Sequence, residues 1–421
     1  MKKTENVLGF VFLLLTLVIG KMFLASEMLF FRLVMGMAFG YTLTRAATGF
    51  AGSVNRAFNT GSTKLMRTLM FMFVISAALT AGLLLMADPT EFGLWINPIN
   101  GGLIIGGLLF GFGMAFSSCC ASGVLTDLIT GLPRALVTLI FFSMGVFIGF
   151  PLQKQGWVAN SWISSEVGEA LGTGGVFLPD WFKFDGLNGY LGALVFTAIM
   201  AGIVVVLSNK YQAKRKKEGT FTGHFMENIQ AEMKDYEADE NYEFPTESTY
   251  ERLFVNPWSL KMGAVVIAIL FTLLMGVTKA GWGASTPYGH WFGRVLVLFG
   301  ANPESVAAWA QQPVNPFIMP FFEHPINVQN FGILLGTAVY LLTAGKFKTT
   351  FMSEMNLTVR EALLFALGGL TMGVGTRLAN GCNVGALYTP IANFSLSGWV
   401  FLVVMVIGGI AGNKFAKKWS K

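Results

Sequence analysis

The sequence is dominated by apolar runs of about 20 residues, the length that an α-helix needs to cross the hydrocarbon core of a bilayer. About ten such runs follow one another, near residues 7–25, 28–44, 67–87, 101–118, 133–151, 188–207, 258–278, 327–344, 360–379 and 395–413. Charged residues make up only 12% of the chain, about half of their share in soluble domains. We therefore expect an all-α polytopic membrane protein.

The first apolar run resembles a signal peptide, because Lys2 and Lys3 precede it. No clear small-x-small cleavage site follows, and the next run begins almost at once, so we expect a retained first helix. The 29 Lys and Arg residues outnumber the 23 Asp and Glu residues. They gather at the ends of apolar runs and form no basic stripe with interleaved aromatics, which argues against nucleic-acid binding.

Basic residues in short loops predict the orientation, because such loops stay on the cytoplasmic side of a membrane. The basic clusters within 45–67, 210–217 and 414–421 fall on the same side as Lys2 and Lys3, if every apolar run crosses once. The sequence therefore predicts a multi-pass protein of the bacterial inner membrane with cytoplasmic N- and C-termini.

Composition divides the chain into a first membrane half at 1–207, a charged linker at 208–257 and a second membrane half at 258–421. We expect the linker on the cytoplasmic side, as a solvated tether or a short helical hairpin. A docking site for a cytosolic partner is the alternative.

A polar segment at 279–326 interrupts the second half. It contains four large aromatic residues beside several prolines: Trp282, Tyr288, Trp291 and Trp309. Tryptophan and tyrosine are enriched at membrane interfaces. We interpret this segment as an outer-face cap with interfacial aromatics.

An internal repeat is the most informative feature of the sequence. The stretch from Gly106 to Gly123 contains Gly-Gly-Leu-Leu-Phe-Gly-Phe-Gly and then Cys119-Cys120. The stretch from Gly368 to Gly385 contains Gly-Gly-Leu-Thr-Met-Gly-Val-Gly and then Gly381-Cys382. One constant offset aligns all five glycines of the pattern and pairs Cys120 with Cys382. The charge pattern orients the two copies oppositely, so we predict two inverted pseudo-symmetric halves, an arrangement typical of transporters.

A short apolar segment follows each repeat cysteine. Gly123–Thr130 comes after Ser122 and ends at Gly131, and Val384–Thr389 comes after Asn383 and ends at Pro390. These segments are too short to cross a bilayer, so we predict re-entrant half-helices with Ser122 and Asn383 as candidate N-caps. Each N-terminus would place unpaired N–H groups and a partial positive charge beside a thiol.

These residues resemble a known family. The glycine pattern ending in Cys120 and the stretch Arg377-Leu-Ala-Asn-Gly-Cys-Asn383 are similar to the paired cysteine signatures of the YeeE/YedE family of sulfur-compound transporters. The resemblance extends to Gly36-Met-Ala-Phe-Gly40, Arg45-Ala46 and Phe50, and covers most of the chain. It implies import of thiosulfate or related sulfur species, or of a selenium species, with a cytosolic TusA-like sulfurtransferase as a candidate partner.

The chain departs from the family pattern at two places. Many members have Gly-Gly-Cys in the first signature, whereas this chain has Ser118-Cys119-Cys120. Many members also carry a cysteine between the Arg-Ala pair and the Phe, where this chain has Gly49. A relay of three thiols therefore cannot be transferred unchanged.

The leading hypothesis is a transporter, not an enzyme, that passes a small sulfur-containing anion along neutral thiols. A thiol buried in apolar surroundings stays protonated, so it can donate to sulfur without repelling an anion. We expect Cys382 to face the periplasmic side and Cys120 the cytoplasmic side. Arg377 is either an anion guide or a residue that snorkels to the interface. The expected pathway residues are Cys120, Cys382, Arg377, Asn383, Ser122, Gly123, Gly381 and Gly385.

Two other functions remain open. A membrane thiol oxidoreductase would use Cys119–Cys120, with Cys382 as a further candidate thiol. A structural subunit of a sulfur-handling complex would leave the inverted half-helices unexplained. The roles of Cys119 and Asp127 are not assigned. The three histidines, His224, His290 and His324, are too scattered for a metal site, and we expect no cofactor.

Overall fold

The computed structural model describes residues 2–117, 120–232 and 247–419, and within these ranges it contains helices and no strand. Each of the ten apolar runs forms a helix: α1 (Lys2–Phe23), α2 (Glu27–Ala46), α4 (Lys64–Leu84), α5 (Gly101–Ser117), α7 (Leu132–Gln153), α10 (Tyr190–Lys217), α13 (Leu260–Thr278), α17 (Pro325–Thr343), α19 (Val359–Leu378) and α21 (Leu396–Trp419). Among the described residues, eight helices are long and apolar enough to span a membrane. The all-α polytopic membrane fold is therefore confirmed.

Shorter segments connect these helices. They are α3 (Gly52–Thr60), η1 (Pro89–Glu91), α6 (Gly123–Thr130), α8 (Gly156–Ala159), α9 (Glu166–Ala170), η2 (Leu178–Trp181), α11 (Phe225–Glu232), α12 (Glu247–Tyr250), η4 (Glu251–Val255), α14 (Thr286–Leu298), α15 (Pro303–Ala310), α16 (Asn315–Ile318), η5 (Phe321–Glu323), α18 (Phe347–Phe351), η6 (Asn383–Tyr388) and α20 (Thr389–Ala392). Both η4 and η6 are π-helical.

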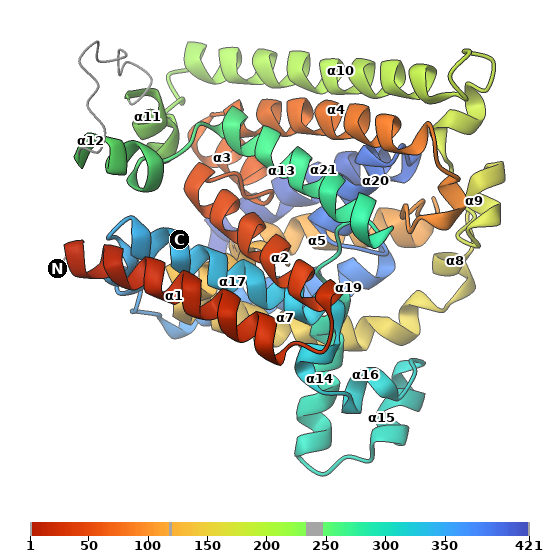
Figure 1. Ribbon diagram of the computed structural model, residues 1–421. Coiled ribbons are helices and arrows are strands. Elements are labelled where there is room, and N and C mark those ends of the chain that lie inside the picture. The colour runs from red at the N-terminus through yellow and green to blue at the C-terminus, as the bar shows by residue number, and fades with distance from the viewer. Residues whose placement is uncertain (1, 118–119, 233–246, 420–421) are drawn as a thin grey trace.

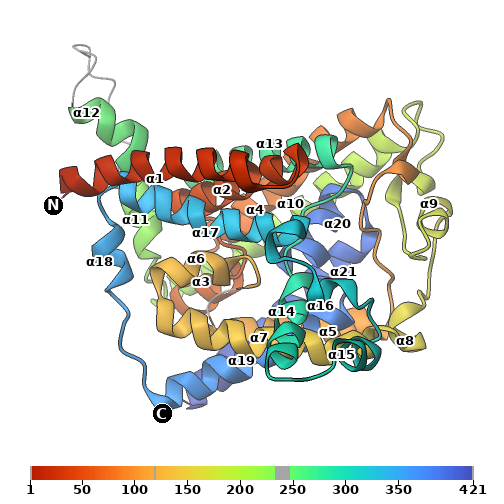
Figure 2. The same ribbon diagram turned by 60° about the horizontal axis from the view of Figure 1, so that its bottom comes forward.

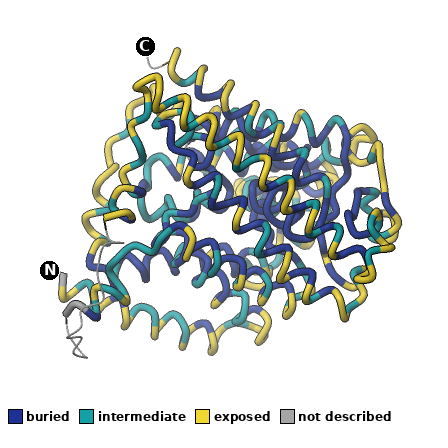
Figure 3. Tube along the Cα trace, turned by 90° about the horizontal axis from the view of Figure 1, so that it is seen from above, coloured by how far each residue is buried: buried dark blue, intermediate teal, exposed yellow. Residues whose placement is uncertain are grey.

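The chain ends lie toward one end of the bundle. Figures 1 and 2 show both termini on the same side as α11 and α12, whereas α8 and α9 lie at the opposite end. Figure 3 shows buried residues along the inner faces of the helices and exposed residues on the outer turns. The assignment of the end with the termini to the cytoplasm stays a prediction from the charge pattern.

The two repeat helices, α5 and α19, pack directly on each other through their glycines. A Cβ at Gly106 would lie 2.7 Å from the carbonyl oxygen of Gly375, and one at Gly113 would lie 2.4 Å from that of Gly368. The beginning of α5 therefore meets the end of α19, and the end of α5 meets the middle of α19. The two helices are antiparallel. Glycine lets the two backbones approach this closely.

The next helix of each repeat packs on the repeat helix of the other half. A Cβ at Gly145 of α7 would lie 2.4 Å from the carbonyl oxygen of Leu370 in α19. A Cβ at Gly408 of α21 would lie 2.2 Å from that of Leu108 in α5. The contact of α7 with α19 corresponds to the contact of α21 with α5, as expected for two inverted copies. The symmetry of the complete halves across a membrane stays a prediction.

The described part of the linker is helical and packed, so a purely solvated tether is wrong there. Helix α10 continues to Lys217, ten residues beyond the predicted end of the first half at 207. Buried Arg45 at the end of α2 donates to the carbonyl oxygens of Arg252, Leu253 and Asn256. These bonds fasten η4 to the C-terminal end of α2, in the first half.

The segment 279–326 is only partly the outer cap that the sequence suggests. Trp282 and Tyr288 are 0% exposed, so their interpretation as interfacial aromatics is wrong. Trp309, by contrast, is 52% exposed, and the elements α14, α15 and α16 project from the bundle in Figure 1. The physical reason is that the first turns of α14 carry Pro287, Tyr288 and Gly289 into the core.

Candidate functional site

The first helix break lies between α5 and α6 and contains Cys120. Cys120 is a free thiol, 1% exposed, and its Sγ lies 3.4 Å from the Oγ of Ser122. Helix α6 has the predicted bounds, Gly123–Thr130, and is followed by Gly131. Ser122 occupies the expected N-cap position, but its side chain accepts no hydrogen bond from the helix and lies against the thiol instead.

The second break lies between α19 and η6 and contains Cys382. This free thiol is 0% exposed. The hydroxyl of Ser285 and the N–H groups of Val384 and Gly385 lie near its sulfur. The helical segment extends through α20 to Ala392, so Pro390 does not end it as expected. Proline fits there because it occupies the first turn of α20, where no N–H is needed.

Asn383 is not the N-cap that the sequence suggests. Its Nδ2 donates to the Sδ of Met114 in α5, at 3.2 Å, and its side chain makes no cap bond. The residue is 0% exposed, and its Oδ1 has no partner among the described groups. The side chain therefore links the second break to the end of the helix that precedes the first break.

Both repeat thiols lie in the interior of the bundle. Cys120 and Cys382 are 1% and 0% exposed, and they are near enough to influence each other electrostatically. The chain turns back into the protein after each repeat helix, so neither thiol lies at the surface. The expectation that Cys382 faces the periplasmic side and Cys120 the cytoplasmic side stays a prediction.

Arg377 supplies a buried positive charge beside Cys382. It is 4% exposed, and its Nη1 and Nη2 donate to Thr286 and Ser285 at 3.2 and 3.1 Å. Its Nε has no partner, and none of the ion pairs among the described residues includes it. The side chain therefore does not snorkel to a surface. A buried cation without a counter-ion is costly, and such residues in membranes are usually functional.

Gly381 and Gly385 allow two close approaches at the second break. A Cβ at Gly381 would lie 2.4 Å from the carbonyl carbon of Gly385. A Cβ at Gly385 would lie 2.3 Å from the indole ring of Trp95. Gly123, the corresponding glycine of the first repeat, is the first residue of α6. The glycines thus permit a tight turn and a tryptophan packed on the helix that follows Cys382.

A pocket of about 430 Å³ is lined by Trp95, together with Asn97, Gln153, Lys154 and Asn380 among others. Trp95 has φ of 60°, a left-handed conformation that is strained for a bulky residue. Its loop is held because Asn97 donates to the carbonyl oxygen of Gly385 at 3.2 Å. Trp95 therefore lines this pocket and also packs on Gly385 of the second break.

Asp127 lies in α6 near the first break. Its carboxylate pairs with Arg134 at 3.2 Å and accepts a hydrogen bond from Thr130 at 3.3 Å. Arg134 also pairs with Glu354 in the segment before α19. Side-chain exposures of 17% for Asp127 and 24% for Arg134 make this a partly exposed ion-pair network.

Sequence reasoning missed several residues of the site. Ser285 and Thr286 lie far from the repeat signatures, and nothing in their local sequence indicates that they contact Arg377. Tyr288 donates to the carbonyl oxygen of Ala121 at 2.5 Å, next to Cys120. Trp95, in the loop before α5, also packs on the second break, and no local pattern indicates it.

Cys119 lies outside the described residues. At Gly49, where many family members carry a cysteine, a Cβ would meet no atom within 4 Å. The loop between α2 and α3 thus has room for a side chain that this sequence lacks.

Comparisons with known proteins identify the family of this chain. The chain is 25% identical over 329 residues to the thiosulfate transporter TsuA of Spirochaeta thermophila, which covers 74% of this chain and 77% of that protein. It is 29% and 28% identical to the probable transporters YedE of Escherichia coli and Salmonella typhimurium. Those two matches span about two fifths of the YedE proteins, 40% and 38% of their lengths. The family profile described as sulphur transport matches residues 45–411, so the chain belongs to this family of sulfur-compound transporters, the YeeE/YedE family.

Proposed function

We propose that this chain imports a small sulfur-containing anion, thiosulfate first, across the bacterial inner membrane. The observation that carries the proposal is the buried guanidinium of Arg377, which has no carboxylate partner and lies beside the free thiol of Cys382. A fixed positive charge in a water-poor interior attracts an anion. The similarity to a protein named thiosulfate transporter supports thiosulfate as the first substrate to test.

The proposed pathway begins in the pocket beside Trp95 and passes Cys382 and then Cys120. A protonated thiol is a weak donor, so it can contact the terminal sulfur of a thiosulfate ion without holding it tightly. Weak successive contacts allow an ion to leave each site, as conduction requires. The unpartnered Nε of Arg377 would supply a donor for the anion.

Uptake of radiolabelled thiosulfate by cells that lack other thiosulfate importers tests this proposal. Cells with the wild-type gene should accumulate label and grow on thiosulfate as sole sulfur source. Cys120→Ser and Cys382→Ser should each abolish uptake while the protein reaches the membrane at the wild-type level. Full uptake by either variant would show that the pathway does not need that thiol.

A membrane thiol oxidoreductase is the second candidate, and it is favoured because Cys120 and Cys382 are both free thiols in the interior that influence each other electrostatically. Forming a disulfide between them would release two electrons and two protons to an acceptor such as a quinone. Alkylation of denatured protein, quenched during thiosulfate uptake, distinguishes the two functions. A transporter should keep both thiols free, whereas an oxidoreductase should accumulate a disulfide when its acceptor is present.

We also propose that a cytosolic TusA-like sulfurtransferase consumes the imported sulfur. The described linker helices lie at the end of the bundle that carries both termini, where such a protein could dock. Co-purification of the full-length membrane protein with the sulfurtransferase, with and without thiosulfate, tests this partner. No retention above an unrelated membrane protein would exclude a stable complex.

A further inference from the structure

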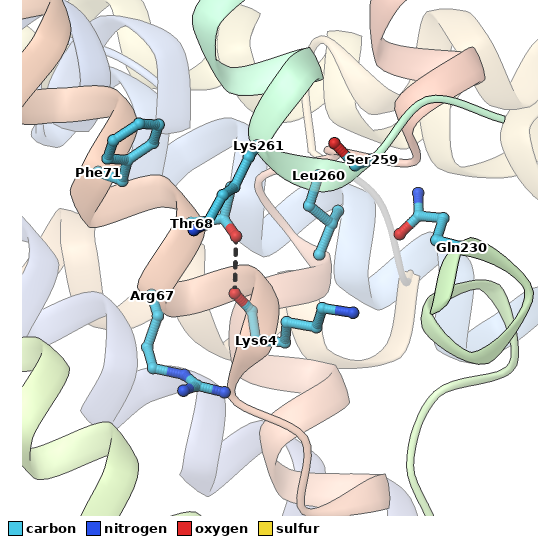
Figure 4. A pocket seen from close by; sticks show the side chains of 8 residues that line it. All are labelled: Lys64, Arg67, Thr68, Phe71, Gln230, Ser259, Leu260 and Lys261. Atoms are coloured by element: carbon cyan, nitrogen blue, oxygen red, sulfur yellow. Dashed lines mark hydrogen bonds between the residues drawn. The ribbon is translucent and has the colours of Figure 1, made fainter. Parts of the chain in front are cut away.

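A second site of different chemistry lies away from the cysteines, between the first turns of α4 and α13. It is a pocket of about 320 Å³, lined by Lys64, Arg67, Thr68, Phe71, Gln230, Ser259, Leu260 and Lys261. Figure 4 shows that these side chains come from three elements, α4, α13 and the linker helix α11. None of the lining residues belongs to the cysteine pathway.

The pocket is strongly positive. Three of its eight lining residues are cationic, Lys64, Arg67 and Lys261, and none is acidic. Among the described residues, no carboxylate forms an ion pair with any of the three. The pocket also receives the N-terminal ends of two helices, which carry partial positive charge. Its charge therefore fits an anionic ligand.

Two buried polar atoms in the pocket lack partners. The Nε of Arg67 is buried and unpartnered, although the two Nη atoms donate to Asn209 and Gln212. Gln230 is 5% exposed, and its Nε2 donates to the carbonyl oxygens of Ala46 and Trp258. Its Oε1 has no partner, and Figure 4 shows this oxygen turned toward Leu260 and Lys64. A ligand that satisfies both atoms must accept from Arg67 and donate to Gln230.

Apolar walls complete the pocket and point to an amphiphile. Phe71, on α4, is 41% exposed, and Leu260 closes the side of α13. Beyond the pocket, α13 presents Ile269 and Leu273, which are 46% and 52% exposed. Both α4 and α13 are long and apolar enough to span a membrane, so their first turns lie at headgroup depth. An acyl chain could therefore continue along these helices while its headgroup stays in the pocket.

We propose that this pocket binds an anionic phospholipid, phosphatidylglycerol, from the leaflet on which α4 and α13 begin. Its phosphate lies among Lys64, Arg67 and Lys261, and a glycerol hydroxyl donates to the Oε1 of Gln230. The bound lipid thereby connects the linker helix α11 to the two membrane halves. This inference does not depend on the identity of the transported anion.

Native mass spectrometry of the full-length protein in detergent, titrated with phosphatidylglycerol or phosphatidylcholine, tests the site. Each lysine near an anionic headgroup adds to affinity, so Lys64→Ala/Lys261→Ala should weaken phosphatidylglycerol binding about tenfold or more. Phosphatidylcholine, whose headgroup has no net charge and no hydroxyl, should bind weakly to both proteins.

Lys21→Ala/Lys279→Ala is the matched control, because it also removes two lysines from helix ends. Lys21 and Lys279 are paired with Glu27 and Glu91 and do not line the pocket. The control should bind phosphatidylglycerol as the wild type does. Equal weakening in both double variants, or no preference of the wild type for phosphatidylglycerol over phosphatidylcholine, would overturn the assignment.

Two further probes define the headgroup. Inorganic phosphate in large excess should not displace the lipid, and displacement would instead identify a soluble-anion site. Phosphatidylmethanol carries the same charge as phosphatidylglycerol but no hydroxyl, so it should bind several-fold more weakly if Gln230 accepts a hydrogen bond. Equal binding of these two lipids would contradict the contact with Gln230.

Discussion

The two helix breaks that hold the repeat cysteines differ in how the protein encloses them. After Cys120, α6 is a regular α-helix whose last turns, from Thr126 to Thr130, are only partly buried. After Cys382, every residue from Asn383 to Ala392 is buried, the first part is π-helical, and Trp95 packs on Gly385. One sequence pattern thus produces a partly open break and a sealed break.

The difference lies in the neighbours and not in the repeated residues. The sealed break has a buried guanidinium, Arg377, whereas the corresponding position of the first repeat is Ala115. The open break has the partly exposed network of Asp127, Arg134 and Glu354. We infer that anion selection occurs at the second break and that the first break mainly provides passage.

The largest effect should come from removing the positive charge at the sealed break. Arg377→Met should reduce thiosulfate uptake about tenfold or more, because a charge-assisted hydrogen bond contributes about 1.5–3 kcal/mol. The loss should be greater at low substrate concentration than at saturation. Initial rates over a range of thiosulfate concentrations measure this difference.

Arg45→Met is the matched control for Arg377→Met, because Arg45 is equally buried but donates to three backbone carbonyls. Its loss should destabilise the solubilised protein by about 3 kcal/mol, since buried acceptors would lose their donors. Arg377→Met should leave thermal stability nearly unchanged or higher. If both variants lose uptake and stability in parallel, Arg377 has a structural role only.

A smaller effect should follow from crowding the contact between Gly385 and Trp95 at the sealed break. Gly385→Ala places a methyl group 2.3 Å from the ring of Trp95, and such overpacking costs about 1–3 kcal/mol. Uptake and thermal stability should both fall, and Gly385→Ala/Trp95→Ala should recover stability. Gly276→Ala is the control, because its Cβ would meet only Leu83 at 3.8 Å. If the double variant does not recover stability, the strain in Gly385→Ala does not come from the contact with Trp95.

A still smaller effect is expected at the open break. Asp127→Asn removes a partly exposed ion pair with Arg134, which is worth about 0.2–1 kcal/mol. Uptake should change by no more than about fivefold. A complete loss of uptake in the same assay would show that Asp127 binds the substrate or a transported proton. The first break would then take a direct part in transport.

The smallest effect should come from making the first signature resemble the second. Cys119 aligns with Gly381 in the second repeat, so Cys119→Gly gives both signatures a glycine at this position. Most uptake should remain, because the proposed pathway uses Cys120 and Cys382. An effect as severe as that of Cys120→Ser would favour an oxidoreductase that needs the vicinal thiols.

Local sequence patterns identified the helices and the repeat. Apolar runs located all ten long helices, and glycine spacing correctly marked where α5 and α19 approach each other. The bounds of α6 followed from Gly131 and the length of its apolar run. Ser122 is at the predicted N-cap position but its side chain does not cap the helix, and the N-cap of η6 is Cys382 and not Asn383. A side chain near a thiol or a neighbouring helix has competing partners that a local pattern does not contain.

The sequence by itself determined that this protein forms membrane helices. It also determined that two of these helices share a repeated glycine pattern and that a cysteine follows each of the two. Hydrophobic length and glycine spacing act over one or two helices, so they can be recognised along the chain. Only the tertiary structure decided that both thiols are buried and that Ser285 and Thr286 accept hydrogen bonds from Arg377. It also decided that Trp95 packs on Gly385 of the second break. These contacts join segments far apart in the chain, and they form because antiparallel helices turn their breaks into the same buried interior.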